Sequence, residues 1–160
     1  ILFHLIIIMM IGAGIGSTAG GMKLYRVSIA LKSAYWSIQD ITGNKKLIRS
    51  HYTYRLGEKV KFDPHEISQN YSFLFIYLII LSIGITIFSF EGYGFIDSIF
   101  EFTSTLGTIG LSYGIIGSNP SNLILWTTIV GMLFARLESY IIIIAVTKLF
   151  IDFKQTIKKS

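Results

Sequence analysis

The sequence has no cysteine, so it contains neither a disulfide framework nor thiolate ligands for a metal ion. It is also poor in charge, because charged residues make up 14% of the chain, against roughly 25% in soluble domains. Hydrophobic residues make up 52%, and the mean hydropathy is +0.62. This balance excludes an ordinary soluble domain and indicates a protein of the lipid bilayer.

Motifs for phosphate and metal chemistry are missing as well. The Gly-rich segment 12–21 fits neither G-x-G-x-x-G nor Walker A, and no strand is expected before it. His4, His51 and His65 are scattered without the spacing of metal ligands. The chain also offers no pairing of a nucleophile with a base. We therefore expect no enzymatic activity and no organic cofactor.

Two apolar stretches are long enough to cross a bilayer as helices. Tyr71 to Phe90 carries no charge and matches the roughly 20 residues that a membrane helix needs. Asn122 to Phe150 is the second stretch, interrupted by Arg136 and Glu138. Between them, Phe95 to Leu106 is too short to span. The pattern predicts an all-α membrane protein.

The basic residues gather in two parts of the chain. Nine of the fourteen Lys and Arg lie between Lys23 and Lys61, four lie from Lys148 onward, and none lies between Glu91 and Ser121. Lys and Arg collect on the cytoplasmic side of membrane spans. We therefore expect a multi-pass protein of the cell membrane. Topology and attraction to anionic lipid explain the basic linker without nucleic acid.

A glycine-punctuated turn separates the two long apolar stretches. It runs from Thr103 to Gly114 and reads TSTLGTIGLSYG. In potassium channels, the filter TVGYG binds the ion through backbone carbonyls, and glycine permits the backbone angles that this requires. The residues with the same chemical outline are Thr108, Ile109, Gly110, Leu111 and Ser112. A re-entrant pore helix and filter loop would have this layout. An ordinary Gly/Ser/Thr turn is the alternative.

The short helix predicted before this turn carries two acidic residues. Asp97 and Glu101 are four residues apart and share one helical face. We expect both to face an outer vestibule, where they would concentrate cations. The alternative is an amphipathic helix lying on the membrane surface, although such helices usually carry Lys or Arg on the polar face.

A second Gly-rich segment interrupts the N-terminal apolar helix. Five glycines in the ten residues Gly12 to Gly21 oppose a regular helix, since each costs up to about 1 kcal/mol relative to Ala. An amphipathic helix is predicted from Met22 to Ile41, with its apolar positions at Val27, Leu31, Ala34, Tyr35 and Ile38. An irregular loop inside a membrane persists only beside protein or a water-filled cavity.

Arg136 and Glu138 interrupt the last apolar stretch. A charge in mid-span costs about 2.5–3.5 kcal/mol on insertion scales, so it normally faces the interior of the helix bundle. Two residues apart on a helix, these side chains point to different faces and do not pair with each other. They line an ion path, or they form structural ion pairs with another part of the protein.

Three segments together resemble the membrane subunit of the Trk/Ktr/HKT superfamily of potassium transporters, in its C-terminal half. They read IGAGIGSTAGGMKLYR, TSTLGTIGLSYG and GMLFARLESYIIIIAVTKLF. The resemblance implies four membrane-pore-membrane repeats around one pore, with the earlier repeats upstream of this chain. Residues 1–41 would then be the second membrane helix of the third repeat, 42–70 a cytoplasmic linker, 71–150 the fourth repeat, and 151–160 a cytoplasmic tail.

The resemblance also implies roles for particular residues. Gly110 matches the central glycine of the fourth filter strand, and Arg136 matches an arginine that reaches toward the pore. The segment 12–21 matches an intramembrane gate loop, whose candidate residues are Gly12, Gly14, Gly16, Ser17, Thr18, Gly20 and Gly21.

The function implied is K⁺ uptake through a carbonyl filter, gated by this loop. The implied partners are a cytosolic nucleotide-binding subunit of the TrkA/KtrA type and a second copy in a homodimer. Transport of Na⁺, or of both ions, by the same architecture stays open. A non-transporting membrane scaffold also stays open.

Overall fold

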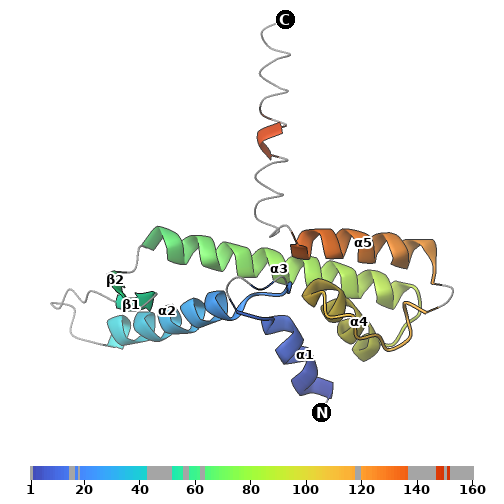
Figure 1. The fold of residues 1–160 in the computed structure, drawn as a ribbon, viewed down its shortest axis with the longest axis horizontal. Helices are drawn as coiled ribbons and strands as arrows, with labels where there is room; N and C mark the ends of the chain where they lie inside the picture. Colours follow the sequence, from blue (N-terminus) through green and yellow to red (C-terminus); the bar gives the residue numbers. More distant parts are fainter. Residues whose placement is uncertain are drawn as a thin grey trace, which may run out of the picture.

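A computed structural model describes residues 2–14, 17, 19–42, 52–55, 58–61, 64–117, 120–136, 147–149 and 151 (Figure 1). Its longer elements are, in chain order, α1 (Leu2–Ile11), α2 (Leu24–Thr42), β1 (Tyr52–Arg55), β2 (Glu58–Lys61), α3 (Pro64–Phe90), α4 (Phe95–Gly107) and α5 (Asn122–Arg136). The fold is predominantly helical, as the apolar stretches predict.

The linker departs from the all-α prediction. Strands β1 and β2 pair in antiparallel fashion, with Tyr52 opposite Lys61 and Thr53 opposite Val60. Tyr, Thr and Val favour strands, because their branched or aromatic side chains fit a pleated surface. A short hairpin therefore stands where the sequence was interpreted only as a polar connector.

The long helix α3 (Pro64–Phe90) packs against α2, α4 and α5. Within the described residues, His65–Phe90 is the one helix that is both long and apolar enough to cross a membrane. It begins at Pro64, seven residues before the uncharged run from Tyr71 to Phe90, because proline is well suited to the first helical position and Glu66 lies in the first turn. Figure 1 shows α2 beside its N-terminal half, and α4 and α5 beside its C-terminal half.

Polar groups join α2 to α3. Asn70 donates its side-chain amide to the Arg26 carbonyl at 2.9 Å, and the hydroxyls of Ser33 and Tyr71 lie 2.8 Å apart. The buried residues of α2 are Ile29 and Ser33. The predicted apolar positions Leu31, Tyr35 and Ile38 do not pack against α3, since all three are more than half exposed. Hydrogen bonding to α3 selects the buried face of α2.

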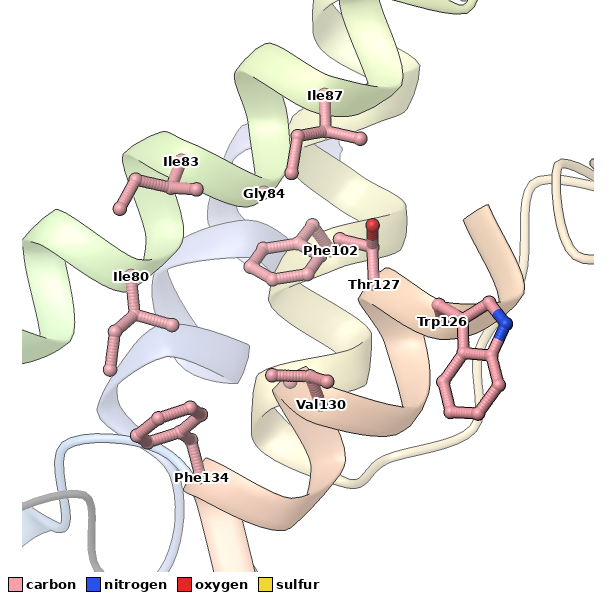
Figure 2. A pocket seen from close by; sticks show the side chains of 10 residues that line it. Ile80, Ile83, Gly84, Ile87, Phe102, Trp126, Thr127, Val130 and Phe134 are labelled. Atoms are coloured by element: carbon pink, nitrogen blue, oxygen red, sulfur yellow. The ribbon is translucent and has the colours of Figure 1, made fainter. Parts of the chain in front are cut away.

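The short helix α4 packs against α1, α3 and α5. Its residues from Phe100 to Gly107 are buried. Phe102 projects toward the space between α3 and α5, where it helps to line an apolar cavity of about 420 Å³ (Figure 2). The Phe102 ring lies so close to Gly84 of α3 that a methyl group there would overlap it. A methyl group on Gly131 of α5 would lie 3.2 Å from the same ring. Two glycines thus make room for the ring that fixes α4.

We expect Gly84→Ala to lower the free energy of unfolding by about 1–3 kcal/mol, because the new methyl group must displace the Phe102 ring. Thermal unfolding of the full-length protein in detergent measures this change. Ser82→Ala, at an exposed position of the same helix, is the control and should melt like wild type. Adding Phe102→Leu should reduce the penalty of Gly84→Ala, since adjacent sites couple. A wild-type melting temperature for Gly84→Ala would contradict this packing.

Candidate functional site

The candidate filter segment leaves α4 in a backbone conformation that is not helical. Thr108 has φ 51° and ψ 40°, and Gly110 and Gly114 have φ values of 84° and 96°. Positive φ suits glycine but strains a β-branched residue such as Thr108. Residues 109–114 are exposed in this chain. The segment therefore presents irregular backbone, with uncharged oxygen atoms, next to a buried helix.

The candidate gate loop, residues 12–21, and the end of α4 are hydrogen-bonded to each other. A helix leaves its last four carbonyls without partners inside the helix. In α4, Ile109 and Thr108 donate their backbone N–H groups to the carbonyls of Ser104 and Thr105. Gly21 donates its N–H to the Leu106 carbonyl and Gly20 to the Gly107 carbonyl, each at 3.1 Å. The loop thus completes the capping of the helix that carries the candidate filter.

The same loop also contacts Thr108, the first residue of the candidate filter. The N–H of Gly20 points to the Thr108 hydroxyl as well, with an N–O distance of 3.1 Å. Gly20 is buried, and a methyl group on it would overlap the Leu106 carbonyl oxygen. The same methyl group would lie 3.1 Å from the Ala135 side chain of α5. No larger residue fits this position without moving the loop.

The loop closes on itself through its ends. Met22 donates its N–H to the Met10 carbonyl at 2.9 Å, and Leu24 donates to the Ala13 carbonyl at 3.2 Å. Gly12 and Gly21 face each other with φ values of 71° and 89°. A Cβ on Gly21 would lie 3.1 Å from the Cα of Gly12. The helix therefore breaks at Gly12 and resumes at Leu24, beyond the predicted end of the loop at Gly21.

The structure brings together some of the predicted site residues. Gly20 and Gly21 lie at the end of α4, with Gly20 bonded to Thr108, and Gly12 lies against these two glycines. Gly14 and Ser17 are exposed. Gly16, Thr18 and Glu138 lie outside the described residues, as does the side chain of Arg136. The backbone of Arg136 ends α5, directly after Ala135, which approaches Gly20.

The predicted position of Glu101 was wrong. Its side chain is 1% exposed and faces the filter segment rather than an outer vestibule. Ser112 donates its hydroxyl to Oε1 of Glu101 at 2.5 Å, and Tyr113 donates its N–H to Oε2 at 2.6 Å. Asp97, one turn earlier, is partly exposed. Helical periodicity places both acids on one face, but packing against the returning chain buries only Glu101.

A cavity of about 440 Å³ lies between α4, the filter segment and α5. Its lining includes Glu101, Thr105, Thr108 and Met132, together with residues 109–112. Hydroxyl and carbonyl oxygens are the groups that can replace the water shell of an alkali cation. The arrangement supplies such oxygens without an opposing basic side chain among these lining residues.

Comparison with known proteins relates this chain to cation transport proteins. A family model described as TrkH, cation transport protein, matches residues 1–152. The chain is 27% identical over 158 residues to an uncharacterized cation transporter of Methanocaldococcus jannaschii, covering 99% of this chain and 32% of that protein. It is 26% identical over 136 residues to the Trk system potassium uptake protein TrkG of Escherichia coli, covering 83% and 27%.

By these matches, the chain is a membrane protein related to cation transporters. Because the family model covers nearly the whole chain, the chain belongs to the TrkH family of cation transport proteins. This family lies within the superfamily that the sequence motifs resemble. The chain spans about a third or less of the length of these curated relatives.

The contacts of Gly20 predict that Gly20→Ala destabilises the protein. The added methyl group would push the loop off α4 and leave the carbonyls of Leu106 and Gly107 unpaired. A buried group that loses its partner costs about 1–3 kcal/mol. Gly14→Ala is a matched control, since nothing lies within 4 Å of a Cβ at Gly14.

Thermal unfolding of the two variants in detergent, in the full-length protein, makes the comparison. Gly20→Ala should melt several degrees below Gly14→Ala. Equal melting temperatures would mean that the loop does not cap α4.

Proposed function

We propose that this chain is part of a cation transporter that takes up K⁺ across the cell membrane. The observation that carries the proposal is the filter segment: irregular backbone with positive φ at Thr108, Gly110 and Gly114, attached to a buried helix. Such backbone at membrane depth is stable only where protein or a water-filled cavity satisfies it. The backbone of Thr108, Ile109, Gly110, Leu111 and Ser112 would bind the transported ion.

The charges around the segment favour a cation. No Lys or Arg occurs between Glu91 and Ser121, and Glu101 is hydrogen-bonded to Ser112 of the filter segment. A negative site attracts cations and repels anions. The name of TrkG, a potassium uptake protein, supports K⁺ as the ion. A Na⁺ transporter of the same architecture is the alternative, and the uptake experiment below separates the two.

We further propose that the loop 12–21 gates the ion path. Its hydrogen bonds to Leu106, Gly107 and Thr108 would make the closed loop and the filter one unit. Loop movement would break these bonds and free the end of α4. A cytosolic nucleotide-binding subunit of the TrkA/KtrA type would control this movement, since TrkG belongs to a Trk system. We propose a multi-pass homodimer in the cell membrane.

Expression of the full-length protein in a host that lacks K⁺ uptake tests the proposal. The wild-type protein should restore growth at low K⁺ and take up K⁺ in preference to Na⁺. Gly110→Ala should lower the K⁺/Na⁺ uptake ratio by about tenfold, because a φ of 84° strains a residue with a side chain. Uptake is compared at equal amounts of protein in the membrane.

Gly117→Ala is the control, at a second glycine that lacks a positive φ although a Cβ there would lie 3.1 Å from the Gly114 carbonyl oxygen. It should lower the K⁺/Na⁺ uptake ratio less than Gly110→Ala does. An unchanged ratio in Gly110→Ala would remove residues 108–112 from the ion path. Preferential uptake of Na⁺ by the wild-type protein would replace K⁺ by Na⁺ in the proposal.

Arg136 gives a separate prediction about the gate. It directly follows Ala135, which approaches the loop at Gly20, and a fixed positive charge there would repel cations. Arg136→Gln removes the charge and should raise K⁺ flux by about tenfold, the factor for a barrier lowered by about 1.4 kcal/mol. Arg136→Lys keeps the charge and should stay near wild type.

Flux measured at matched protein levels decides between the roles of Arg136. If both variants disturb gating, the planar guanidinium holds the loop by hydrogen bonds instead. If neither variant differs from wild type, Arg136 only anchors the helix bundle.

A further inference from the structure

The carboxylate of Glu101 joins the middle of α4 to the chain that leaves the filter. Ser112 donates its hydroxyl at 2.5 Å, Tyr113 its N–H at 2.6 Å, and Ile116 its N–H at 3.3 Å. Two of these bonds come from backbone amides, so they fix the path of the chain as well as one side chain. One buried side chain therefore holds a stretch of five residues.

The donors match an ionised carboxylate, which only accepts hydrogen bonds. The Ser112 oxygen accepts the N–H of Gly114 at 3.0 Å, which leaves the hydroxyl proton for Glu101. Bonds from a hydroxyl and amides to a charged acceptor are stronger than bonds between neutral groups. They also offset the cost of burying the charge, which is large when a carboxylate lacks partners.

A second contact from the same helix reinforces this attachment. The ring of Phe100 meets the ring of Tyr113 edge to face, with 5.4 Å between centroids. Glu101 thus holds the backbone of Tyr113, and Phe100 contacts its ring. By contrast, nothing in the described chain lies within 4 Å of a Cβ at Gly110 or Gly114. Within the described residues, packing does not fix these two glycines, and the attached residues Ser112 and Tyr113 lie between them.

We propose that Glu101 is the positioning residue of the filter: its carboxylate holds residues 112–116 so that the carbonyls from Gly110 to Ser112 keep one orientation toward the ion. The proposal rests on the proposed function for its effect on transport. It assigns Glu101 no direct contact with the ion. Selectivity depends on the number and geometry of coordinating carbonyls, so loosening this attachment should reduce selectivity.

Three substitutions in the full-length protein separate this role from a simple effect of charge. Glu101→Gln keeps the size of the side chain but leaves one acceptor oxygen for three donors. Glu101→Asp keeps the charge but is one methylene too short to reach all three. Asp97→Asn removes an acid one turn earlier on the same helix, where the side chain is partly exposed.

The K⁺/Na⁺ uptake ratio is the first measurement. Glu101→Gln and Glu101→Asp should each lower it by about tenfold, the size expected when a charge-assisted hydrogen bond is lost. Asp97→Asn should retain the wild-type ratio. Ser112→Ala should lower the ratio less, and its effect should add incompletely to that of Glu101→Gln, because both remove the same bond.

Hydrogen–deuterium exchange of the purified protein is the second measurement, and it does not depend on transport. The amides of Tyr113 and Ile116 should exchange about tenfold faster in Glu101→Gln than in wild type or Asp97→Asn. The wild-type protein could fail to transport K⁺ while the amides of Tyr113 and Ile116 still exchange faster in Glu101→Gln. In that case the proposed function fails and the positioning role stands.

The following results in the Glu101 variants would overturn the proposal. Unchanged exchange at Tyr113 and Ile116 in Glu101→Gln would show that the carboxylate does not hold the chain. Wild-type selectivity in Glu101→Asp, with reduced selectivity in Glu101→Gln, would assign the effect to charge alone. If Glu101→Gln does not reach the membrane, the same exchange measurement in Glu101→Asp decides, and wild-type exchange at Tyr113 and Ile116 in that variant would also refute the role.

Discussion

The four hydrogen bonds that cap the last carbonyls of α4 are the constraint on which the rest of the site depends. A buried helix cannot leave these carbonyls unpaired, since each would cost about 1–3 kcal/mol. Two partners come from the turn after the helix, and two come from Gly20 and Gly21, far away in the sequence. The glycines are needed because the loop backbone must approach the helix end more closely than a side chain permits. The loop 12–21 and the candidate filter segment therefore form one structural unit.

Three separate contacts hold α4 and the segment that follows it. Phe102 holds the helix between Gly84 and Gly131, the loop holds its C-terminal end, and Glu101 holds the segment that follows. Irregular backbone inside a membrane protein needs such support, because it has few hydrogen bonds of its own. Helix α4 fixes the position of the irregular segment, and the segment supplies the oxygen atoms.

The sequence predicted those features that depend on composition and on local backbone rules. The uncharged run from Tyr71 to Phe90 predicted the long apolar helix α3, and the glycines at 12–21 predicted the break between α1 and α2. The sequence could not predict which segment of the chain packs against each helix surface. Ser33 is buried because Tyr71 offers it a hydroxyl, and Glu101 is buried because Tyr113 and Ile116 return to it. Periodicity places a residue on a face, but only packing decides what that face contacts.

Locating the ion directly tests the central claim, that the backbone from Thr108 to Ser112 binds the transported cation. Crystals of the full-length protein soaked in Rb⁺, a heavier alkali cation, would reveal the ion by its anomalous scattering. The account predicts Rb⁺ in contact with carbonyl oxygens of these residues, with Glu101 bonded behind them. Rb⁺ bound elsewhere in the membrane region, with these carbonyls turned toward protein partners, would contradict it.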